Sequence, residues 1–299
     1  DPAWLDPEVL RATAAAGGAR EVFLSHNDIE VPYSDQASIG MRNAFGLFGH
    51  DWIAEVTLSH IRSRDGIAFM LGNRRDDGGF FPPDPPGATD PPPWGAGFAP
   101  FSNMILMVNA LETDSNALYL RLEKSYTPSS GWGTTIAYTY TDSEQNSPID
   151  GWPGAFNAER IEDYGDFPGK VPEHRLVATG IIDGPWGLTF SGKLTLASAT
   201  PRYYQNCNMS EWAYCHFSYY TPDEDFRQLD LAAEKRWDTG TDLQLRLRLD
   251  VLNVFNWANY SGYEDWRGGA NEPQNPNFGR PNAIALPTRT LKVSLGFNW

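Results

Sequence analysis

Aromatic side chains crowd two polar stretches of the sequence, and their chemistry suits the binding of a flat or sugar-like ligand. Tyr and Trp rings can stack on such a ligand while their polar atoms form hydrogen bonds. The candidate ligand-binding residues are Tyr203, Tyr204, Trp212, Tyr214, Tyr263 and Trp266. The alternative is that these rings pack among the loops or form an aromatic girdle. The sequence therefore predicts a ligand site here and leaves a packing role open.

Cys207 and Cys215 lie in the first of these stretches and are the 2 cysteines of the chain. In an oxidising compartment, two thiols at this spacing would close a small loop as a disulfide. In a reducing compartment they would stay as two free thiols. The rest of the sequence favours an oxidising compartment, so we predict a Cys207–Cys215 disulfide.

Signatures of enzymes and metal centres are absent from the sequence. It has no His-Glu-x-x-His, no Gly-x-Ser-x-Gly and no phosphate-binding glycine loop. None of its 5 histidines is spaced with a second His or Cys as a metal pair requires. Clusters such as Asp76-Asp77 and Asp223-Glu224-Asp225 could hold a hard cation, although solvated loop charge explains them better. We therefore expect no catalysis, no metal site and no cofactor.

The composition favours an all-β chain with no affinity for nucleic acid. Aromatic residues make up 13% of the 299 residues, and 28 Gly and 23 Pro supply many turn formers. A net charge of −15 argues against nucleic acid, because phosphate binding requires clustered Lys and Arg. No run of about 18 apolar residues is present, so we expect no transmembrane helix. Transmembrane strands remain open, because half of their residues face a polar lumen.

Apolar and polar residues alternate strictly in segments of about ten residues, the length of a tilted strand that crosses a bilayer. The clearest segment runs from Asp242 to Val251. One of its faces carries Leu243, Leu245, Leu247, Leu249 and Val251. The other face carries Asp242, Gln244, Arg246, Arg248 and Asp250. Large aliphatic residues opposite charged ones indicate a strand between lipid and a water-filled lumen.

Weaker versions of the pattern recur along the chain and predict nine membrane strands. They are expected at 34–46, 52–64, 115–126, 131–143, 173–183, 187–199, 225–237, 241–255 and 288–299. The connections between them alternate short and long, as periplasmic turns and outer loops do in barrels. The apolar stretch Met104 to Leu111 predicts a further strand at 103–112 within the long loop from Arg64 to about Asn116, and it could raise the count to ten.

An odd strand count has a consequence for closure. Complete bacterial barrels have even strand numbers, so nine strands predict that further strands lie upstream. Ala37 to Phe45 and Leu291 to Trp299 would then be open edges. Unpaired backbone groups in hydrocarbon cost several kcal/mol each. We therefore expect that residues 1–299 alone do not form a closed, transport-competent barrel.

Several short stretches resemble TonB-dependent outer-membrane receptors, particularly the Oar-like ones. The most specific is the stretch 250–256, Asp-Val-Leu-Asn-Val-Phe-Asn, followed after a long loop by Phe278-Gly279-Arg280 and by the stretch 287–290. Others are Pro32-Tyr33-Ser34-Asp35-Gln36, Asn116-Ala117-Leu118, the strand Tyr138-Thr139-Tyr140-Thr141, and Pro172-Glu173-His174-Arg175. The final strand, which ends on the aromatic residue Trp299, resembles the last strand of outer-membrane proteins in general. The order and spacing of these pieces agree from about residue 30 to 299.

The resemblance implies an all-β fold, the C-terminal part of a 22-stranded antiparallel transmembrane barrel. Residues 1–299 would be that part, without the N-terminal plug and roughly the first thirteen strands. It also implies a receptor or transporter in the outer membrane of a Gram-negative bacterium. The implied partners are outer-membrane lipid, a nutrient of the siderophore, oligosaccharide or peptide class, and a TonB-type energy-coupling protein that contacts the missing N-terminal part.

Three alternatives follow from the same residues. A ten-stranded outer-membrane protease would suit the chain length, but it needs an Asp-His pair at the barrel mouth, and no Asp stands two positions before any His. An adhesin fragment would be a non-catalytic barrel or sandwich. A soluble β-sandwich also alternates apolar and polar residues, although less extremely than the segment 242–251.

Overall fold

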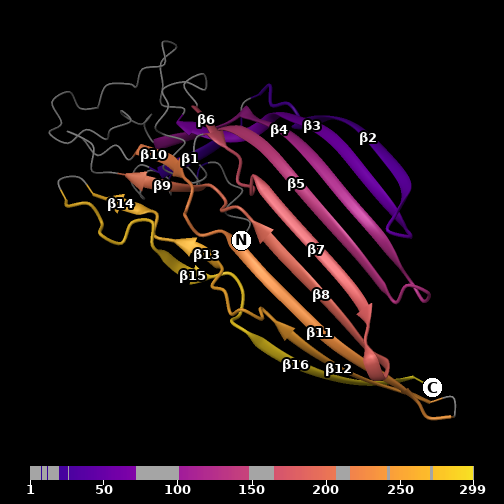
Figure 1. Cartoon of the computed structure of the whole chain (residues 1–299). Helices are drawn as coiled ribbons and strands as arrows, with labels where there is room; N and C mark the ends of the chain where they lie inside the picture. The colour runs from indigo at the N-terminus through magenta and orange to yellow at the C-terminus, as the bar shows by residue number, and fades with distance from the viewer. Residues whose placement is uncertain are drawn as a thin grey trace.

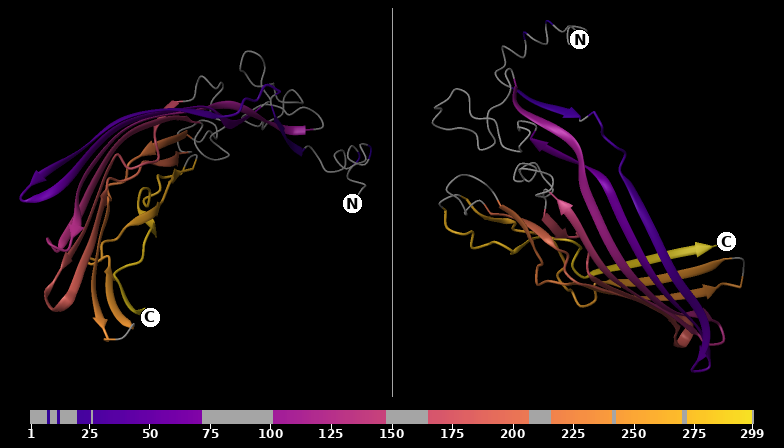
Figure 2. Two further views of the ribbon diagram at one scale, coloured as in Figure 1. Left: turned by 90° about the vertical axis from the view of Figure 1, so that its right-hand side faces the viewer. Right: turned by 90° about the horizontal axis from the view of Figure 1, so that it is seen from above.

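The computed structural model describes residues 8, 12, 20–25, 27–71, 101–147, 165–206, 216–240, 243–269 and 272–298. Its main feature is one large antiparallel sheet that is strongly curved from end to end (Figures 1 and 2). Among the described residues, no helix is long and apolar enough to cross a membrane.

Nine strands make up the main path of this sheet in the described residues, and each pairs antiparallel with its neighbours in the path. In chain order they are β2 (Tyr33–Leu47), β3 (His50–Leu71), β4 (Phe101–Thr127), β5 (Trp132–Ser147), β7 (His174–Asp183), β8 (Leu188–Ala197), β11 (Phe226–Asp238), β12 (Gln244–Leu252) and β16 (Thr290–Asn298). All nine strands predicted from the alternation are confirmed, with bounds that differ mostly at the ends.

Short connections join the strands in pairs at one end of the sheet, which we call the turn end (Figure 1). The tightest is the turn between β2 and β3, where Phe48 and Gly49 both have positive φ, 54° and 74°. Positive φ at both central residues is the two-residue turn whose twist matches that of a hairpin. The long connections lie at the opposite end, the loop end. The predicted alternation of short and long connections is therefore confirmed.

One face of the sheet is apolar in all nine strands, because cross-strand partners lie on the same face. One row of this face, for example, is formed by Met41, Val56, Leu120, Tyr138, Leu176 and Leu196. On β12, Leu245, Leu247 and Leu249 are 36%, 39% and 40% exposed. No layer of the described residues covers these side chains, so the apolar face is suited to lipid and not to water.

The opposite face is polar and carries paired charges. In register, Lys193 faces Asp230 and Asp250 faces Lys292. Arg248 Nη2 lies 2.8 Å from Asp250 Oδ1, and its Nη1 lies 3.6 Å from Glu234 Oε2. The predicted facing of β12, with leucines on one side and Gln244, Arg246 and Arg248 on the other, is confirmed as a division between the two faces.

Aromatic residues mark both ends of the apolar face. At the turn end, the rings of Trp52 and Trp132 meet edge to face at 6.0 Å. Toward the loop end, the Tyr138 hydroxyl lies 2.8 Å from His174 Nδ1, and Tyr140 packs on the same imidazole at 5.3 Å. Amphipathic rings at both borders of an apolar band are typical of a sheet that spans a membrane.

The predicted separate strand at 103–112 is corrected: these residues are the first part of β4 and continue without a break into its membrane portion. The cause is the unexpected length of β3, which runs on to Leu71 and pairs with this stretch beyond a register shift at Ser63/Gly66. Asn109 Nδ2 donates to the backbone oxygen of Asp65 at 2.6 Å and stabilises the bulge. The segment is therefore not a tenth strand of the main path.

Seven shorter strands of the described residues lie at the loop end (Figure 1). The strand β1 (Arg20–Ser25) pairs parallel with β4, and β6 (Gly165–Pro168) pairs with β5. A three-stranded sheet contains β9 (Arg202–Asn206), β10 (His216–Tyr220) and β14 (Trp266–Gly268), and a two-stranded sheet contains β13 (Tyr260–Tyr263) and β15 (Pro281–Ile284).

Within the described residues, the main path is open, with β2 and β16 as its two end strands. The two predicted edges are therefore confirmed as the ends of the sheet, apart from Trp299, which lies outside the described residues.

Candidate ligand site at the loop end

Four of the predicted ligand-binding residues belong to the small sheets at the loop end. Tyr203 and Tyr204 lie on β9, Tyr263 on β13 and Trp266 on β14. Although β9 and β14 are far apart in the chain, they pair parallel, with Trp266 beside Gln205. The structure thus brings the two aromatic stretches together. Four other predicted residues lie outside the described residues: Trp212, Tyr214, Cys207 and Cys215.

Tyr204 takes part in a packed aromatic cluster. Its ring lies 6.0 Å from that of Tyr220 and 5.2 Å from that of Phe278, and the last two rings are 5.3 Å apart. The Arg267 guanidinium lies over the rings of Tyr204 and Phe278, at 5.6 and 5.5 Å from their centroids. The contacts of Tyr204 therefore fit the packing role that the sequence left open.

Tyr203 has a polar partner from the other loop. Burial raises the pKa of Tyr203, and the carboxylate of Asp265, which accepts a hydrogen bond from its hydroxyl, raises it further. The backbone N–H of Gln205 donates to the backbone oxygen of Asp265 at 2.9 Å, so the two loops are joined at this point. At neutral pH Tyr203 is therefore a protonated donor.

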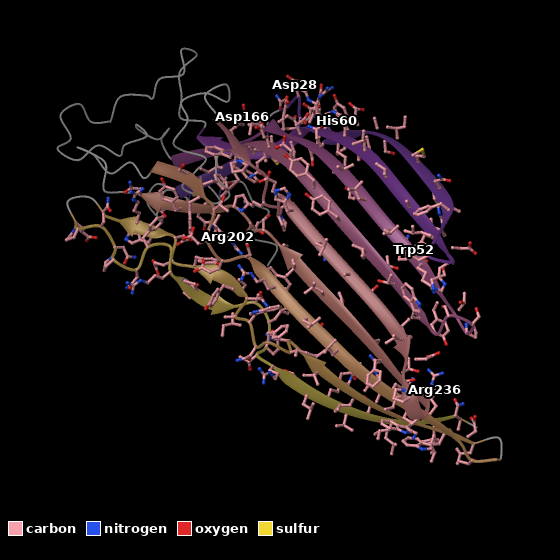
Figure 3. All side chains as sticks on the ribbon, in the orientation of Figure 1. Asp28, Trp52, His60, Asp166, Arg202 and Arg236 are labelled. Atoms are coloured by element: carbon pink, nitrogen blue, oxygen red, sulfur yellow. The ribbon has the colours of Figure 1, made fainter. Side chains whose placement is uncertain are left out.

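A hollow of about 270 Å³ lies between the loop-end strands and the ends of β7, β8 and β11. Its lining includes Arg175 from β7, Arg202 from β9, Glu224 and Asp225 from the segment before β11, and Tyr260 and Tyr263 from β13. Figure 3 labels Arg202 near the strand ends at this side of the molecule. Tyr263 is thus the predicted binding residue that lines the hollow.

The hollow opens on the polar face of the sheet. Arg175 pairs in register with Thr139 and Ala197, and Ala197 pairs with Phe226. These residues lie on the same face of the sheet as Lys193 and Asp230, whereas the apolar row through Leu176 and Leu196 lies on the other face. A ligand in the hollow would therefore sit at the mouth of the polar surface.

Two polar atoms near the hollow are buried without a hydrogen-bond partner: Arg202 Nε and the Tyr220 hydroxyl. The Arg202 guanidinium lies over the ring of Tyr263, 5.7 Å from its centroid. Burial raises the pKa of Tyr220, while the positive charge of Arg202 opposes that rise. Buried donors without a partner are uncommon in folded proteins and mark a place where a water or ligand acceptor can bind.

The side chains of two asparagines anchor the loop that leads into β13. Asn259, which is 2% exposed, donates from Nδ2 to the backbone oxygen of Arg227 at 2.9 Å and accepts from the Arg227 N–H at 2.8 Å. Asn253 makes the equivalent pair of bonds to the backbone of Trp257. The amide groups act like a short piece of paired strand, so β13 is kept beside β11.

Sequence reasoning missed Arg175 and Arg202 as members of one site. Arg175 lies in a strand whose alternating apolar and polar residues indicate only which face of the sheet Arg175 is on. Arg202 and Tyr220 are separated by the segment that contains the cysteines, and they become neighbours because β9 and β10 pair with Arg202 opposite Tyr220. The acidic stretch Asp223-Glu224-Asp225 was the available signal. Among the described residues, no three His, Cys, Asp or Glu side chains are placed to hold a metal ion.

No family model and no curated protein matches the chain. Among solved structures, the outer membrane transporter YddB from Escherichia coli is similar, with a TM-score of 0.59, 12% identity, and coverage of 94% of this chain and 34% of that one. The ferripyoverdine receptor of the outer membrane of Pseudomonas aeruginosa has a TM-score of 0.52 and 12% identity, with coverage of 89% and 27%. The FpvAI–pyocin S2 complex also has a TM-score of 0.52 and 12% identity, with coverage of 90% and 28%.

These likenesses concern the fold, since the sequence identities are low. The sheet has the antiparallel fold of part of an outer-membrane β-barrel. The resemblance first seen in short sequence motifs therefore agrees with the three-dimensional likeness to outer-membrane receptors. The chain spans about a third or less of the length of these solved proteins.

Proposed function

We propose that this chain is part of the barrel of a receptor or transporter in the outer membrane of a Gram-negative bacterium. The observation that carries the proposal is the two-faced sheet: within the described residues, one face is apolar in all nine strands and exposes side chains such as Leu247, while the other carries charge pairs such as Arg248–Glu234. A sheet of this kind suits lipid on one side and a water-filled lumen on the other. The likeness to YddB and to the ferripyoverdine receptor supports the same reading.

The cargo in this proposal is a nutrient of the siderophore, oligosaccharide or peptide class. The loop-end hollow supports ligand recognition, because aromatic and charged side chains from separate loops converge there. Tyr260 and Tyr263 supply flat surfaces and Arg202 a positive charge. Among the similar solved structures, the Pseudomonas aeruginosa receptor was solved with ferripyoverdine bound.

Energy coupling through TonB and the absence of catalysis are further parts of the proposal. The coupling is suggested by the receptor-like motifs between about residue 30 and residue 299. The non-catalytic role is suggested by the sequence, which lacks the hydrolase and metalloprotease motifs. In this proposal the described residues bind the ligand at the loop end and line its path along the polar face.

The test uses the complete gene product expressed in Escherichia coli strains with and without TonB. The protein should migrate faster unboiled than boiled on a gel, as a folded barrel does, and should fractionate with the outer membrane. Three labelled probes, ferric pyoverdine, maltohexaose and a hexapeptide, separate the cargo classes. Uptake of one probe that stops without TonB is the expected result.

Two other results would contradict parts of the proposal. A protein that does not shift on heating and stays in the soluble fraction would exclude the membrane barrel. Uptake at the same rate in both strains would exclude TonB coupling while leaving the barrel in place.

A further inference from the structure

The acidic side chains that line the hollow already have partners within the protein. Asp225 Oδ1 accepts a hydrogen bond from the Ala199 N–H at 3.2 Å, and Asp225 Oδ2 lies 3.6 Å from Arg227 Nη2. Glu224 accepts a hydrogen bond from the Tyr263 hydroxyl. Neither carboxylate is therefore an open site for a cationic ligand.

The two arginines of the hollow, in contrast to Asp225, have no ion-pair partner among the described residues. Arg175 and Arg202 form no ion pair within the described part of the chain, whereas Arg62, Arg121, Arg227, Arg236 and Arg248 each do. Arg202 Nε is also buried without any hydrogen-bond partner. Other described arginines, such as Arg42 and Arg246, also lack an ion pair, but Arg175 and Arg202 line the same hollow. The hollow therefore presents two guanidinium groups that no described carboxylate pairs with, and at least one unused donor.

We propose that Arg175 and Arg202 form an anion subsite, which binds a carboxylate or phosphate group of the cargo. This inference rests on the proposed function and narrows the cargo to molecules with such a group. The planar guanidinium presents two parallel N–H donors to the two oxygens of an oxyanion, and Nε is one of the donors in that fork. The buried Tyr220 hydroxyl, which also lacks a partner, is a further donor beside Arg202.

The dimensions of the hollow agree with a subsite. Pockets that enclose a whole drug-sized ligand measure about 300–1,000 Å³, and this one measures about 270 Å³. It can therefore take one polar group while the rest of the ligand lies outside. The Arg202 guanidinium lies over the ring of Tyr263, and this contact holds the charge beside the hollow without neutralising it.

The test measures binding of three probes to the purified full-length protein in detergent: citrate, pyrophosphate and maltotriose. The first two distinguish a carboxylate from a phosphate, and the neutral maltotriose is the comparison. The variants are Arg175→Gln, Arg202→Gln and Arg202→Lys. Arg62→Gln is the matched control, because Arg62 also lies at the loop end but is on the apolar face and is paired with Glu112 at 3.0 Å.

We expect one anion to bind more tightly than maltotriose. Its affinity should fall about tenfold or more in Arg175→Gln and Arg202→Gln, as when a charged hydrogen bond is lost. The affinity of Arg202→Lys for the anion should lie between those of these variants and the wild type, because lysine keeps the charge and loses the Nε–H. Arg62→Gln should change it less than about twofold. All four variants should keep heat-modifiable migration, which shows that they fold.

Binding of neither anion, binding that Arg202→Gln leaves unchanged, or equal binding of maltotriose would each overturn the anion subsite. Failure of the subsite is separable from failure of the proposed function. A heat-modifiable outer-membrane protein that ignores both anions would refute the subsite alone. A protein that never enters the membrane would refute the proposed function itself.

Discussion

Asparagine side chains determine how β12 ends and how the next loop begins. Asn253 and Asn256 have positive φ, 52° and 56°, a conformation that asparagine tolerates better than most residues. The Asn253 N–H donates to Asp230 Oδ1 at 2.9 Å, and Asn256 Oδ1 accepts from the Arg289 N–H at 2.8 Å. The motif in the stretch 250–256 is thus the place where a membrane strand turns into a loop.

Replacing Asn253 with Ala should destabilise the protein by about 2–3 kcal/mol. The side chain is 3% exposed, and Ala loses both amide hydrogen bonds to Trp257 while still having to adopt positive φ. Urea unfolding of the protein in detergent measures the change. Asn253→Asp is the matched control, because aspartate keeps the hydrogen-bond acceptor and should lower the free energy of unfolding by less. Equal stability of Asn253→Ala and wild type would refute the anchoring role.

Tyr203 should ionise at higher pH than an exposed tyrosine. Burial and Asp265 raise its pKa, so the folded state favours the protonated phenol. A group whose folded pKa is raised stabilises the fold below its unfolded pKa, about 10, and that contribution is lost as pH rises through the folded pKa. The difference in absorbance at about 295 nm between wild type and Tyr203→Phe during an alkaline titration gives the pKa. A midpoint at or below 10 would contradict both the burial of Tyr203 and its contact with Asp265.

The Cys207–Cys215 disulfide stays a prediction, since both residues lie outside the described part. If the loop end faces an oxidising medium, the two thiols should be bonded, with Cα atoms within about 7 Å. Mass spectrometry of the native, unreduced protein after treatment with a thiol reagent measures this. Two labels per chain before reduction would show that the disulfide does not form.

The strands were predictable from the sequence because one face of each is apolar along most of its length. The alternation in Leu245, Leu247 and Leu249 is visible in a single chain and needs no knowledge of neighbours. The extra length of β3 and β4 was not predictable, because the Ser63/Gly66 register shift interrupts the period-two pattern. The loop-end strands are short and depend on partners distant in sequence.

The candidate site was predictable only in part, for the same physical reason. Aromatic crowding pointed to Tyr263, which lines the hollow, and also to Tyr204, which packs with Tyr220 and Phe278. Sequence alone cannot separate these two roles. The difference depends on pairing between β9, β10 and β14, and on the contact of Asn259 with Arg227.

A charged residue in the apolar row of β12 should be costly. Leu249 lies between Ala233 and Val293, within the apolar face and away from both aromatic borders. Leu249→Arg should reduce stability by about 2–4 kcal/mol, as arginine does near the middle of a bilayer. Ser191→Arg on β8 is the control, because Ser191 lies on the polar face and pairs with Ala232, which in turn pairs with Asp250. Unfolding from lipid vesicles measures both, and equal effects would contradict the assignment of faces.

At the scale of the whole molecule, the described sheet is strongly curved, and it has one face suited to lipid and one suited to water. The strands β2 and β16 end the path of the described sheet. A backbone edge in hydrocarbon has to be paired, so a membrane barrel requires partners for both strands. The loop-end hollow opens on the polar face, and in the proposed function the ligand binds there.

The most direct test of the two-faced sheet is a spin-label scan of β12 in lipid vesicles, made with the full-length protein. Single cysteines at positions 245 to 250 carry the label, and its accessibility to oxygen and to a water-soluble nickel reagent is measured. We predict oxygen maxima at 245, 247 and 249 and nickel maxima at 246, 248 and 250, since successive side chains point to opposite faces. Accessibility to oxygen that is uniform along β12, or that peaks at Arg246 and Arg248, would contradict the central claim that the leucine face meets lipid.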